Sequence, residues 1–241
     1  MIELTNLTCE FDKQTVLENI SLTIENHLTI LGANGSGKST LAKSICGISP
    51  FSGEIKIDAQ ELQNISYTER AKLISYIPAK LDIYDNFILV EEFVLLGRFP
   101  FKKSFFDYSQ DDKNIVMQML EFLNISHLKS HTVGSLSSGE QQLVLIAQAL
   151  TQQSKIIIFD EPTANLDPLN SKIIAENIKA LKDSHQVILI THDLHLACYV
   201  DSSIMFIKEK SAELYEREFF EDETLKELYG VEFSSLAVKY V

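Results

Sequence analysis

A glycine-rich stretch near the N-terminus has the residue types that bind phosphate. Its sequence, Gly-Ala-Asn-Gly-Ser-Gly-Lys-Ser over residues 32–39, fits the spacing G-x-x-x-x-G-K-[ST]. Glycines let successive backbone N–H groups turn toward phosphate oxygens, and a helix that starts here adds the positive end of its dipole. Lys38 would reach the β- and γ-phosphates of a nucleotide, and the Ser39 hydroxyl would face Mg²⁺. The candidate phosphate-binding residues are Gly32, Ala33, Asn34, Gly35, Ser36, Gly37, Lys38, Ser39 and Thr40.

Two adjacent carboxylates follow an apolar run in the second half of the chain. Residues 156–159 predict a buried strand, and Asp160 and Glu161 come directly after it. Parallel α/β sheets bind ligands beyond the carboxyl ends of their strands, so both side chains should face the phosphate loop. Asp160 would hold Mg²⁺ directly or through water, and Glu161 would accept a proton from the attacking water. Such a pair is often only a solvated strand end, but its position after a phosphate loop favours the catalytic interpretation.

The strands that must position these motifs fall into two kinds. Alternating apolar residues at 4–8, 20–24 and 53–58 predict half-exposed antiparallel strands. Continuous apolar runs at 156–159 and 187–190 predict parallel strands covered on both faces, and residues 28–31 predict a strand that leads into the glycine-rich turn. Residues 38–46 predict a helix that ends before Gly47, and a polar loop is expected around 64–68.

Helical spacing dominates the middle of the chain, between about residues 81 and 150. We therefore expect an α/β fold, a P-loop NTPase core with a mostly parallel sheet, an N-terminal antiparallel β-subdomain and an inserted helical subdomain. The whole of 1–241 would form one domain. Within this domain, residues 1–80 and 151–241 would form the core and the antiparallel layer, and residues from about 81 to 150 would form the helical subdomain.

Composition narrows the classes of partner. Asp and Glu number 34 against 21 Lys and Arg, a formal net charge of -13, so nucleic acid is not expected as the main partner. Three widely spaced cysteines without a CxxC pair predict reduced thiols and no zinc site. No apolar run approaches the roughly 18 residues that a membrane-spanning helix needs, so any membrane span would come from another chain.

A serine- and glycine-containing turn lies shortly before the carboxylate strand. Residues 136–142 read Leu-Ser-Ser-Gly-Glu-Gln-Gln, and Ser137 and Glu140 have the spacing of a capping box at a helix N-terminus. This segment resembles the signature motif of ABC ATPases. The resemblance implies that Ser137 and Gly139 contact the γ-phosphate bound to a second subunit, so that hydrolysis requires a head-to-tail dimer. Ser138 stands where the family usually has glycine, and Glu140 where glutamine is common.

Three further segments resemble motifs of the same family. Residues 164–167 resemble the D-loop, which implies a role for Asp167 across the dimer. His192, after the strand over 187–190, resembles the switch histidine that would bond the γ-phosphate and help hold the water; alone, such a histidine is more often a surface residue. Phe11 matches the aromatic residue that stacks on adenine, although a lone Phe in a strand is usually part of a core.

One position departs substantially from the family pattern. After Ser-Tyr-Ile-Pro at 75–78 the family normally has a glutamine that reaches Mg²⁺ and the attacking water, and this chain has Ala79. A methyl group cannot coordinate a metal or form a hydrogen bond. Either Lys80 or a bound water substitutes, or the coupling to a partner is altered.

Two segments resemble ATPases that serve importers of iron complexes, such as siderophores and haem, and of cobalamin. They are residues 95–101, Leu-Leu-Gly-Arg-Phe-Pro-Phe, and residues 229–231, Tyr-Gly-Val. The aromatic residues near the first segment could equally be internal packing or an apolar patch for a permease. They are Phe99, Phe101, Phe105 and Phe106.

Taken as a whole, the resemblance implies an ATPase subunit of an ABC transporter that uses ATP and Mg²⁺. Its expected partners are a second copy of the chain, integral membrane permease subunits and, indirectly, a substrate-binding protein. The expected location is cytoplasmic, on the inner face of the cell membrane through the permease. Two alternatives stay open, namely a regulatory subunit that hydrolyses weakly and a soluble ABC ATPase without a permease.

Overall fold

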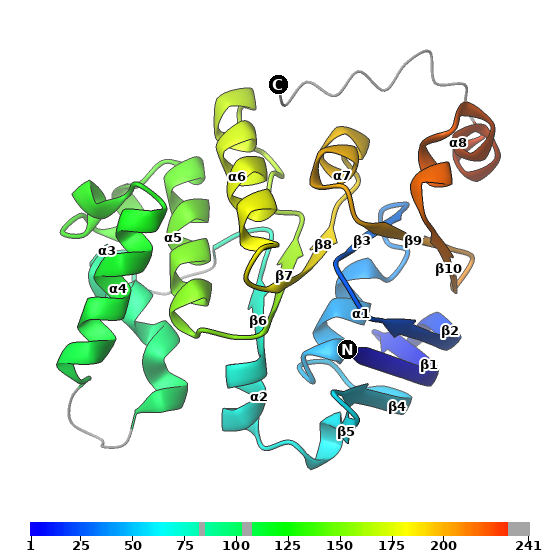
Figure 1. Cartoon of the computed structure of the whole chain (residues 1–241), viewed down its shortest axis with the longest axis horizontal. Helices are drawn as coiled ribbons and strands as arrows, with labels where there is room; N and C mark the ends of the chain where they lie inside the picture. Colours follow the sequence, from blue (N-terminus) through cyan, green and yellow to red (C-terminus); the bar gives the residue numbers. More distant parts are fainter. Residues whose placement is uncertain (82–84, 103–107, 231–241) are drawn as a thin grey trace.

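The computed structural model describes residues 1–81, 85–102 and 108–230. A six-stranded sheet lies at the centre of the molecule, a four-stranded sheet lies on one side of it, and a group of helices lies at the opposite end (Figure 1). The strands are β1 Ile2–Phe11, β2 Gln14–Ile24, β3 Leu28–Gly32, β4 Phe51–Ile57, β5 Gln60–Glu61, β6 Ile74–Ile77, β7 Ile156–Asp160, β8 Gln186–Ile190, β9 Ser203–Lys208 and β10 Ser211–Tyr215. The α-helices are α1 Lys38–Ile45, α2 Tyr67–Leu73, α3 Val90–Leu95, α4 Gln110–Phe122, α5 Ser138–Thr151, α6 Pro168–Leu181, α7 Leu194–Val200 and α8 Asp222–Tyr229. Short 3₁₀ helices are η1 Leu62–Asn64, η2 Leu96–Phe101, η3 Ser126–Leu128, η4 Val133–Ser135 and η5 Arg217–Phe220.

The central sheet has the strand order β10-β9-β3-β8-β7-β6. Its strands pair in parallel except β10, which pairs antiparallel with β9. Successive side chains of a strand point to opposite faces, so Ile156 and Ile158 pack toward α1 and the second sheet, while Ile157 and Phe159 pack toward α5 and α6. Every residue of β3 and β7 is buried. The prediction of parallel strands covered on both faces is confirmed.

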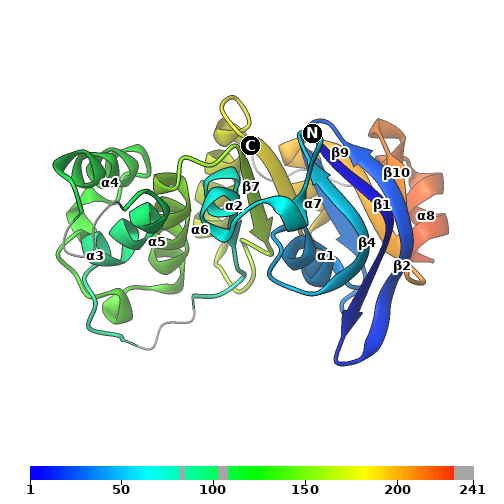
Figure 2. The same ribbon diagram turned by 90° about the horizontal axis from the view of Figure 1, so that it is seen from below.

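The four-stranded sheet has the order β2-β1-β4-β5, and each pair of neighbouring strands is antiparallel. Gly53 allows β4 to pass close to β1, because its φ is +91° and a Cβ there would lie 2.3 Å from the Asn6 carbonyl oxygen. Figure 2 shows α1 between this sheet and the central sheet. The expected fold class, a P-loop NTPase core with an antiparallel sheet and additional helices, is confirmed.

Helices α3, α4 and α5 pack together at the end of the molecule away from the antiparallel sheet (Figure 1). The Arg98 guanidinium connects α4 with α5. Its Nε lies 2.7 Å from Asp112 Oδ1 on α4, and its Nη1 donates to the Thr151 carbonyl at the end of α5 at 2.8 Å. Arg98 also covers the Phe101 ring at 3.8 Å. The helical spacing predicted for this region is confirmed, while its status as a subdomain stays a prediction. No helix within the described ranges is both long and apolar enough to cross a bilayer.

The loop expected around 64–68 is wrong in its second half. Helix α2 begins at Tyr67, and Ser66 is its N-cap. The Glu69 N–H donates to Ser66 Oγ at 3.3 Å, and Ser66 Oγ donates to the Glu69 carboxylate at 2.9 Å. A serine followed three residues later by glutamate favours a helix start, and here it prevails over the polar composition.

Candidate active site

The motif residues meet at the carboxyl edge of the central sheet. The phosphate loop follows β3, Asp160 ends β7, Glu161 follows it, and His192 comes two residues after β8. Because these three strands are parallel and adjacent, their carboxyl ends lie at one edge, where such sheets bind ligands. The structure therefore brings the phosphate loop, the carboxylate pair and the histidine together.

The phosphate loop has the backbone shape that the glycines permit. Gly35 and Gly37 have φ of +79° and +101°, and Gly37 is the N-cap of α1. Gly32 is needed for close approach, since a Cβ there would lie 2.6 Å from the Ile207 carbonyl oxygen. Ser36 Oγ is buried and has no hydrogen-bond partner among the described residues. A buried hydroxyl at the mouth of a helix N-terminus fits an anion such as phosphate.

Lys38 is almost completely buried and folds back on this loop. Its Nζ donates to the carbonyl oxygens of Gly32 at 2.9 Å and Ala33 at 3.0 Å. Burial lowers the pKa of Lys38, and the negative charges of Glu161 and Asp160 act in the opposite direction. A cation held in this way can exchange carbonyl partners for phosphate oxygens, which carry full negative charge.

Asp160 and Ser39 form an oxygen-rich pair on the α1 side of the sheet. Ser39 Oγ donates to Asp160 Oδ1 at 2.9 Å, and Asp160 is buried. Hydroxyl and carboxylate oxygens are the ligands that Mg²⁺ prefers, together with water and substrate phosphates, so the donor set fits this ion. Tyr76, which the sequence reasoning missed, donates from Oη to Asp160 Oδ2 at 2.6 Å. Burial and the Asp160 carboxylate raise the pKa of Tyr76, so it stays a donor.

Glu161 and His192 form a second pair. His192 Nδ1 lies 2.8 Å from Glu161 Oε2, and the two side chains are 61% and 18% exposed. The Glu161 backbone has φ of +49°, and its N–H donates to the Ile190 carbonyl oxygen at 2.9 Å. The Glu161 carboxylate thus lies next to His192, and both side chains are exposed enough for a water molecule to reach them.

The serine turn is the N-terminus of α5. Ser137 is the N-cap, its N–H donates to Glu140 Oε2 at 2.8 Å and its Oγ donates to the same atom at 2.6 Å. These hydrogen bonds lower the pKa of Glu140, which is therefore ionised. The predicted capping box is confirmed.

Asp167 caps the next helix, α6. Its Oδ1 accepts from the N–H groups of Leu169 at 2.9 Å and Asn170 at 3.0 Å, and its Oδ2 accepts from the Asn170 side chain. The Asn170 amide in turn packs against Gly139, because a Cβ on Gly139 would lie 2.4 Å from Asn170 Cγ. In one subunit Asp167 is thus committed to its own helix. Its role across a dimer stays a prediction.

The remaining expected residues are placed as follows. Phe11 ends β1 and is 62% exposed, which leaves its ring free of the core and available for stacking. Ala79 and Lys80 are both exposed on the segment after β6. Phe99 is 69% exposed, whereas Phe101 lies under Arg98 and 4.9 Å from Lys72 Nζ. Phe105, Phe106 and Val231 lie outside the described residues.

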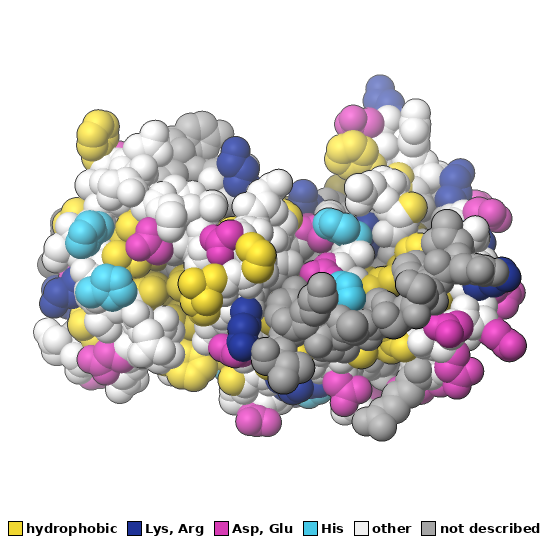
Figure 3. All heavy atoms as spheres, turned by 90° about the horizontal axis from the view of Figure 1, so that it is seen from above, with side chains coloured by type: hydrophobic (Ala, Val, Ile, Leu, Met, Phe, Trp, Pro, Cys, Tyr) yellow, Lys and Arg dark blue, Asp and Glu magenta, His cyan; other side chains and the backbone are white. Residues whose placement is uncertain are grey.

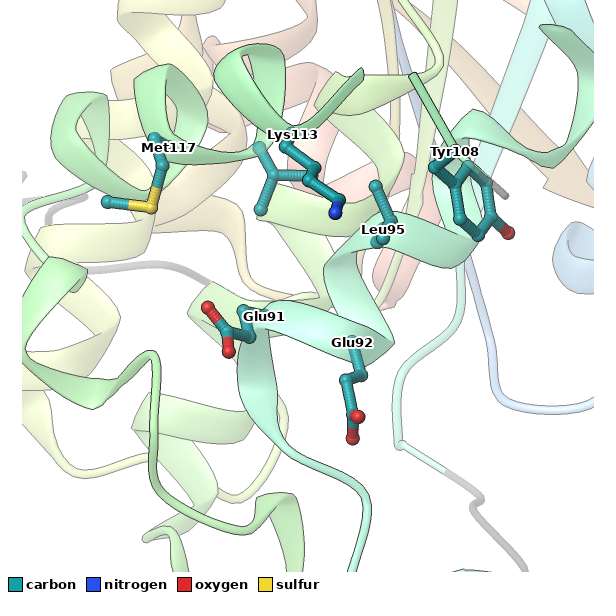
Figure 4. A pocket seen from close by; sticks show the side chains of 7 residues that line it. Glu91, Glu92, Leu95, Tyr108, Lys113 and Met117 are labelled. Atoms are coloured by element: carbon teal, nitrogen blue, oxygen red, sulfur yellow. The ribbon is translucent and has the colours of Figure 1, made fainter. Parts of the chain in front are cut away.

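The surface has a hollow away from these motifs. A pocket of about 430 Å³ lies between α3 and α4, with Glu91, Leu95, Lys113 and Met117 in its wall (Figure 4).

On the face seen in Figure 3, the basic side chains of the described residues lie singly among acidic ones. Among the described residues of that face, no basic stripe of the kind that binds nucleic acid is present.

Comparison with known proteins identifies the chain's family. A family model described as ABC transporter matches residues 17–164, more than half of the sequence. The chain belongs to the ABC transporter family. This ABC ATPase is 32% identical over 243 residues to the hemin import ATP-binding protein HmuV of Pseudomonas fluorescens, with 96% of the chain and 93% of the relative covered. It is also 32% identical over 214 residues to the manganese transport system ATP-binding protein MntB of Halalkalibacterium halodurans, with 87% and 84% covered.

Solved structures agree with this assignment. A structure described as a metal-chelate type ABC transporter in an inward-facing conformation superposes with a TM-score of 0.83 at 26% identity, covering 96% of this chain and 89% of that one. A dimeric ATP-binding cassette in a post-hydrolysis state, bound to ADP and phosphate, superposes with a TM-score of 0.73 at 25% identity, covering 90% and 98%. The ABC ATPase is accordingly a nucleotide-binding, ATP-hydrolysing subunit. The roles of its individual residues stay predictions.

Proposed function

We propose that two copies of this ABC ATPase enclose two MgATP molecules and hydrolyse them. The observation that carries the proposal is the convergence of two pairs, Ser39 with Asp160 and Glu161 with His192, at the phosphate loop. Phe11 would stack on adenine, and the loop from Gly32 to Thr40 would hold the phosphates. Mg²⁺, when bound to Ser39 and Asp160, would neutralise charge on the β- and γ-phosphates.

The chain's own residues supply the remaining steps. Glu161 orients the attacking water and accepts its proton. His192, which lies beside the Glu161 carboxylate in this structure, would exchange that partner for the γ-phosphate and help hold the water. Ser137 and Gly139 of the second copy would complete each site, with Asp167 near the contact between the copies. Because Ser137 Oγ now donates to Glu140, closure would exchange that partner for a phosphate oxygen.

We further propose that hydrolysis drives import of a metal complex, such as a ferric siderophore, haem or cobalamin, through integral membrane permease subunits. The haem importer relative and the metal-chelate transporter structure support this class of cargo, and the manganese relative makes a free metal ion the main competitor. The permease would hold the ATPase at the inner face of the membrane, and a substrate-binding protein would act indirectly. Exposed Phe87, Leu96 and Phe99 supply apolar area for such a contact.

Turnover of the purified chain tests the enzymatic proposal. We expect Mg²⁺-dependent ATP hydrolysis that Glu161→Gln lowers by two orders of magnitude or more while ATP binding persists, because general-base catalysis contributes about 10²–10⁴-fold. Glu223→Gln, on the exposed face of α8, is the matched control and should hydrolyse normally. Equal turnover in Glu161→Gln and wild type would contradict the catalytic role.

Ala79 provides the test against a regulatory subunit. If the chain only binds nucleotide, its turnover will be negligible and Ala79→Gln will raise it strongly. Robust wild-type turnover would exclude that alternative. Purification from membranes together with a multi-spanning partner would identify the permease and distinguish a transporter subunit from an ABC ATPase that works without one.

A further inference from the structure

We propose that Tyr76 is a positioning residue for the metal-binding carboxylate of Asp160. The inference rests on the proposed MgATP site and adds a residue that the motifs do not contain. Tyr76 lies on β6 at the edge of the central sheet, outside the phosphate loop, in the Ser-Tyr-Ile-Pro segment that precedes Ala79. Its hydroxyl nevertheless reaches Asp160 directly, with Oη donating to Oδ2 at 2.6 Å.

Strand register places the tyrosine. In the parallel pairing of β6 with β7, Ile74 lies opposite Ile156 and Tyr76 lies opposite Ile158. Alternate residues share a face, so Tyr76 and Asp160 both point to the α1 side, with Asp160 two residues beyond Ile158. The long tyrosine side chain spans that diagonal step. A shift of one residue in register would turn Tyr76 to the opposite face.

The Asp160 carboxylate is held by a different donor on each oxygen. Ser39 Oγ donates to Oδ1 from α1, and Tyr76 Oη donates to Oδ2 from β6. Asp160 is only 4% exposed, so little solvent is available to hold a rotated carboxylate. With the tyrosine fixing Oδ2, Oδ1 stays directed at Ser39, the other candidate Mg²⁺ ligand. Partners of this kind typically change metal affinity by 10- to 100-fold.

A purely structural role is the competing explanation, since Tyr76 also packs against the apolar cluster between the two sheets. The two roles predict different effects of Tyr76→Phe, which keeps the ring and removes the hydroxyl. Tyr67→Phe is the matched control, because Tyr67 is 84% exposed on α2 and lies over Arg70.

The experiment measures binding of a fluorescent ATP analogue to the full chain, first in EDTA and then during titration with MgCl₂. For Tyr76→Phe we expect unchanged affinity in EDTA and a half-saturating Mg²⁺ concentration raised about tenfold. Tyr67→Phe should match the wild type in both. Urea unfolding without nucleotide establishes that each variant is folded under the binding conditions.

Each outcome decides the matter. An unchanged or lowered Mg²⁺ requirement in folded Tyr76→Phe overturns the positioning role, as does an equal loss of affinity with and without Mg²⁺, which indicates a general structural defect. If Tyr76→Phe is unfolded, the hydroxyl serves the fold and the proposal also fails. Failure of the wild type to bind nucleotide would instead overturn the proposed function, so the two failures are distinguishable.

Discussion

Replacement of Gly139 by alanine should destabilise the protein through a clash with Asn170. A Cβ at Gly139 would lie 2.4 Å from Asn170 Cγ, 2.6 Å from Oδ1 and 2.7 Å from Nδ2. The Asn170 amide cannot turn aside freely, because its Nδ2 donates to Asp167 Oδ2. If the Asn170 amide stays in place, overpacking of this kind costs about 1–3 kcal/mol. If the amide rotates away, it loses its hydrogen bond to Asp167, which costs about 1 kcal/mol. Because the higher helix propensity of alanine offsets up to about 1 kcal/mol of this cost, we expect Gly139→Ala to lower the free energy of unfolding by about 1–2 kcal/mol.

A double-mutant cycle isolates the cause. Asn170→Ala removes the clashing atoms, so adding Gly139→Ala to it should be neutral or slightly stabilising, since alanine favours helix more than glycine by about 1 kcal/mol. Urea denaturation followed by circular dichroism gives the four unfolding free energies. Additive effects, or a neutral Gly139→Ala alone, would refute the steric reasoning. The unfolding measurements are made without nucleotide, so their result is independent of the proposed function.

Two further predictions concern buried ionisable groups. Arg98→Ala should lower the free energy of unfolding by about 3–5 kcal/mol, because it removes the cationic partner of the buried Asp112 carboxylate; a loss below about 1 kcal/mol in urea unfolding would contradict this. Burial raises the pKa of Cys46 to about 12, so the thiol loses its proton at a lower pH in the unfolded chain than in the folded protein. The free energy of unfolding therefore falls as pH rises from about 9 to about 12. Wild type should therefore lose more stability over this pH interval than Cys46→Ala, and parallel curves for the two proteins would exclude the effect.

The predicted site residues lie together where chemistry and position are encoded locally, while their roles stay predictions. The phosphate loop and the pair Asp160 and Glu161 are contiguous in sequence, and parallel strands bring their ends to one edge. Placement of His192 beside Glu161 follows from the same rule, because β8 lies next to β7. These contacts needed no information beyond strand type and order.

Contacts that depend on register or on helix packing were not predictable. The bond from Tyr76 to Asp160 requires the pairing of β6 with β7, which joins segments about 80 residues apart. The packing of Gly139 on Asn170 requires the crossing of α5 and α6. The start of α2 was different, because the signal was present as Ser66 and Glu69 and only the polar composition argued against it.

The central claim is that nucleotide joins two copies through Ser137. We expect Glu161→Gln to double in mass on adding ATP and Mg²⁺, measured by size-exclusion chromatography with light scattering, because the slowed turnover holds the closed state. Adding Ser137→Asp should retain an acceptor for the Glu140 N–H, since aspartate is a good N-cap, although its charge also opposes that of Glu140. It should prevent dimer formation by placing a negative charge against the γ-phosphate. Ser137→Asn, an equally good cap without the charge, is the control and should still dimerise. A Glu161→Gln protein that binds ATP yet stays monomeric, or one that dimerises equally well with Ser137→Asp, would contradict the account.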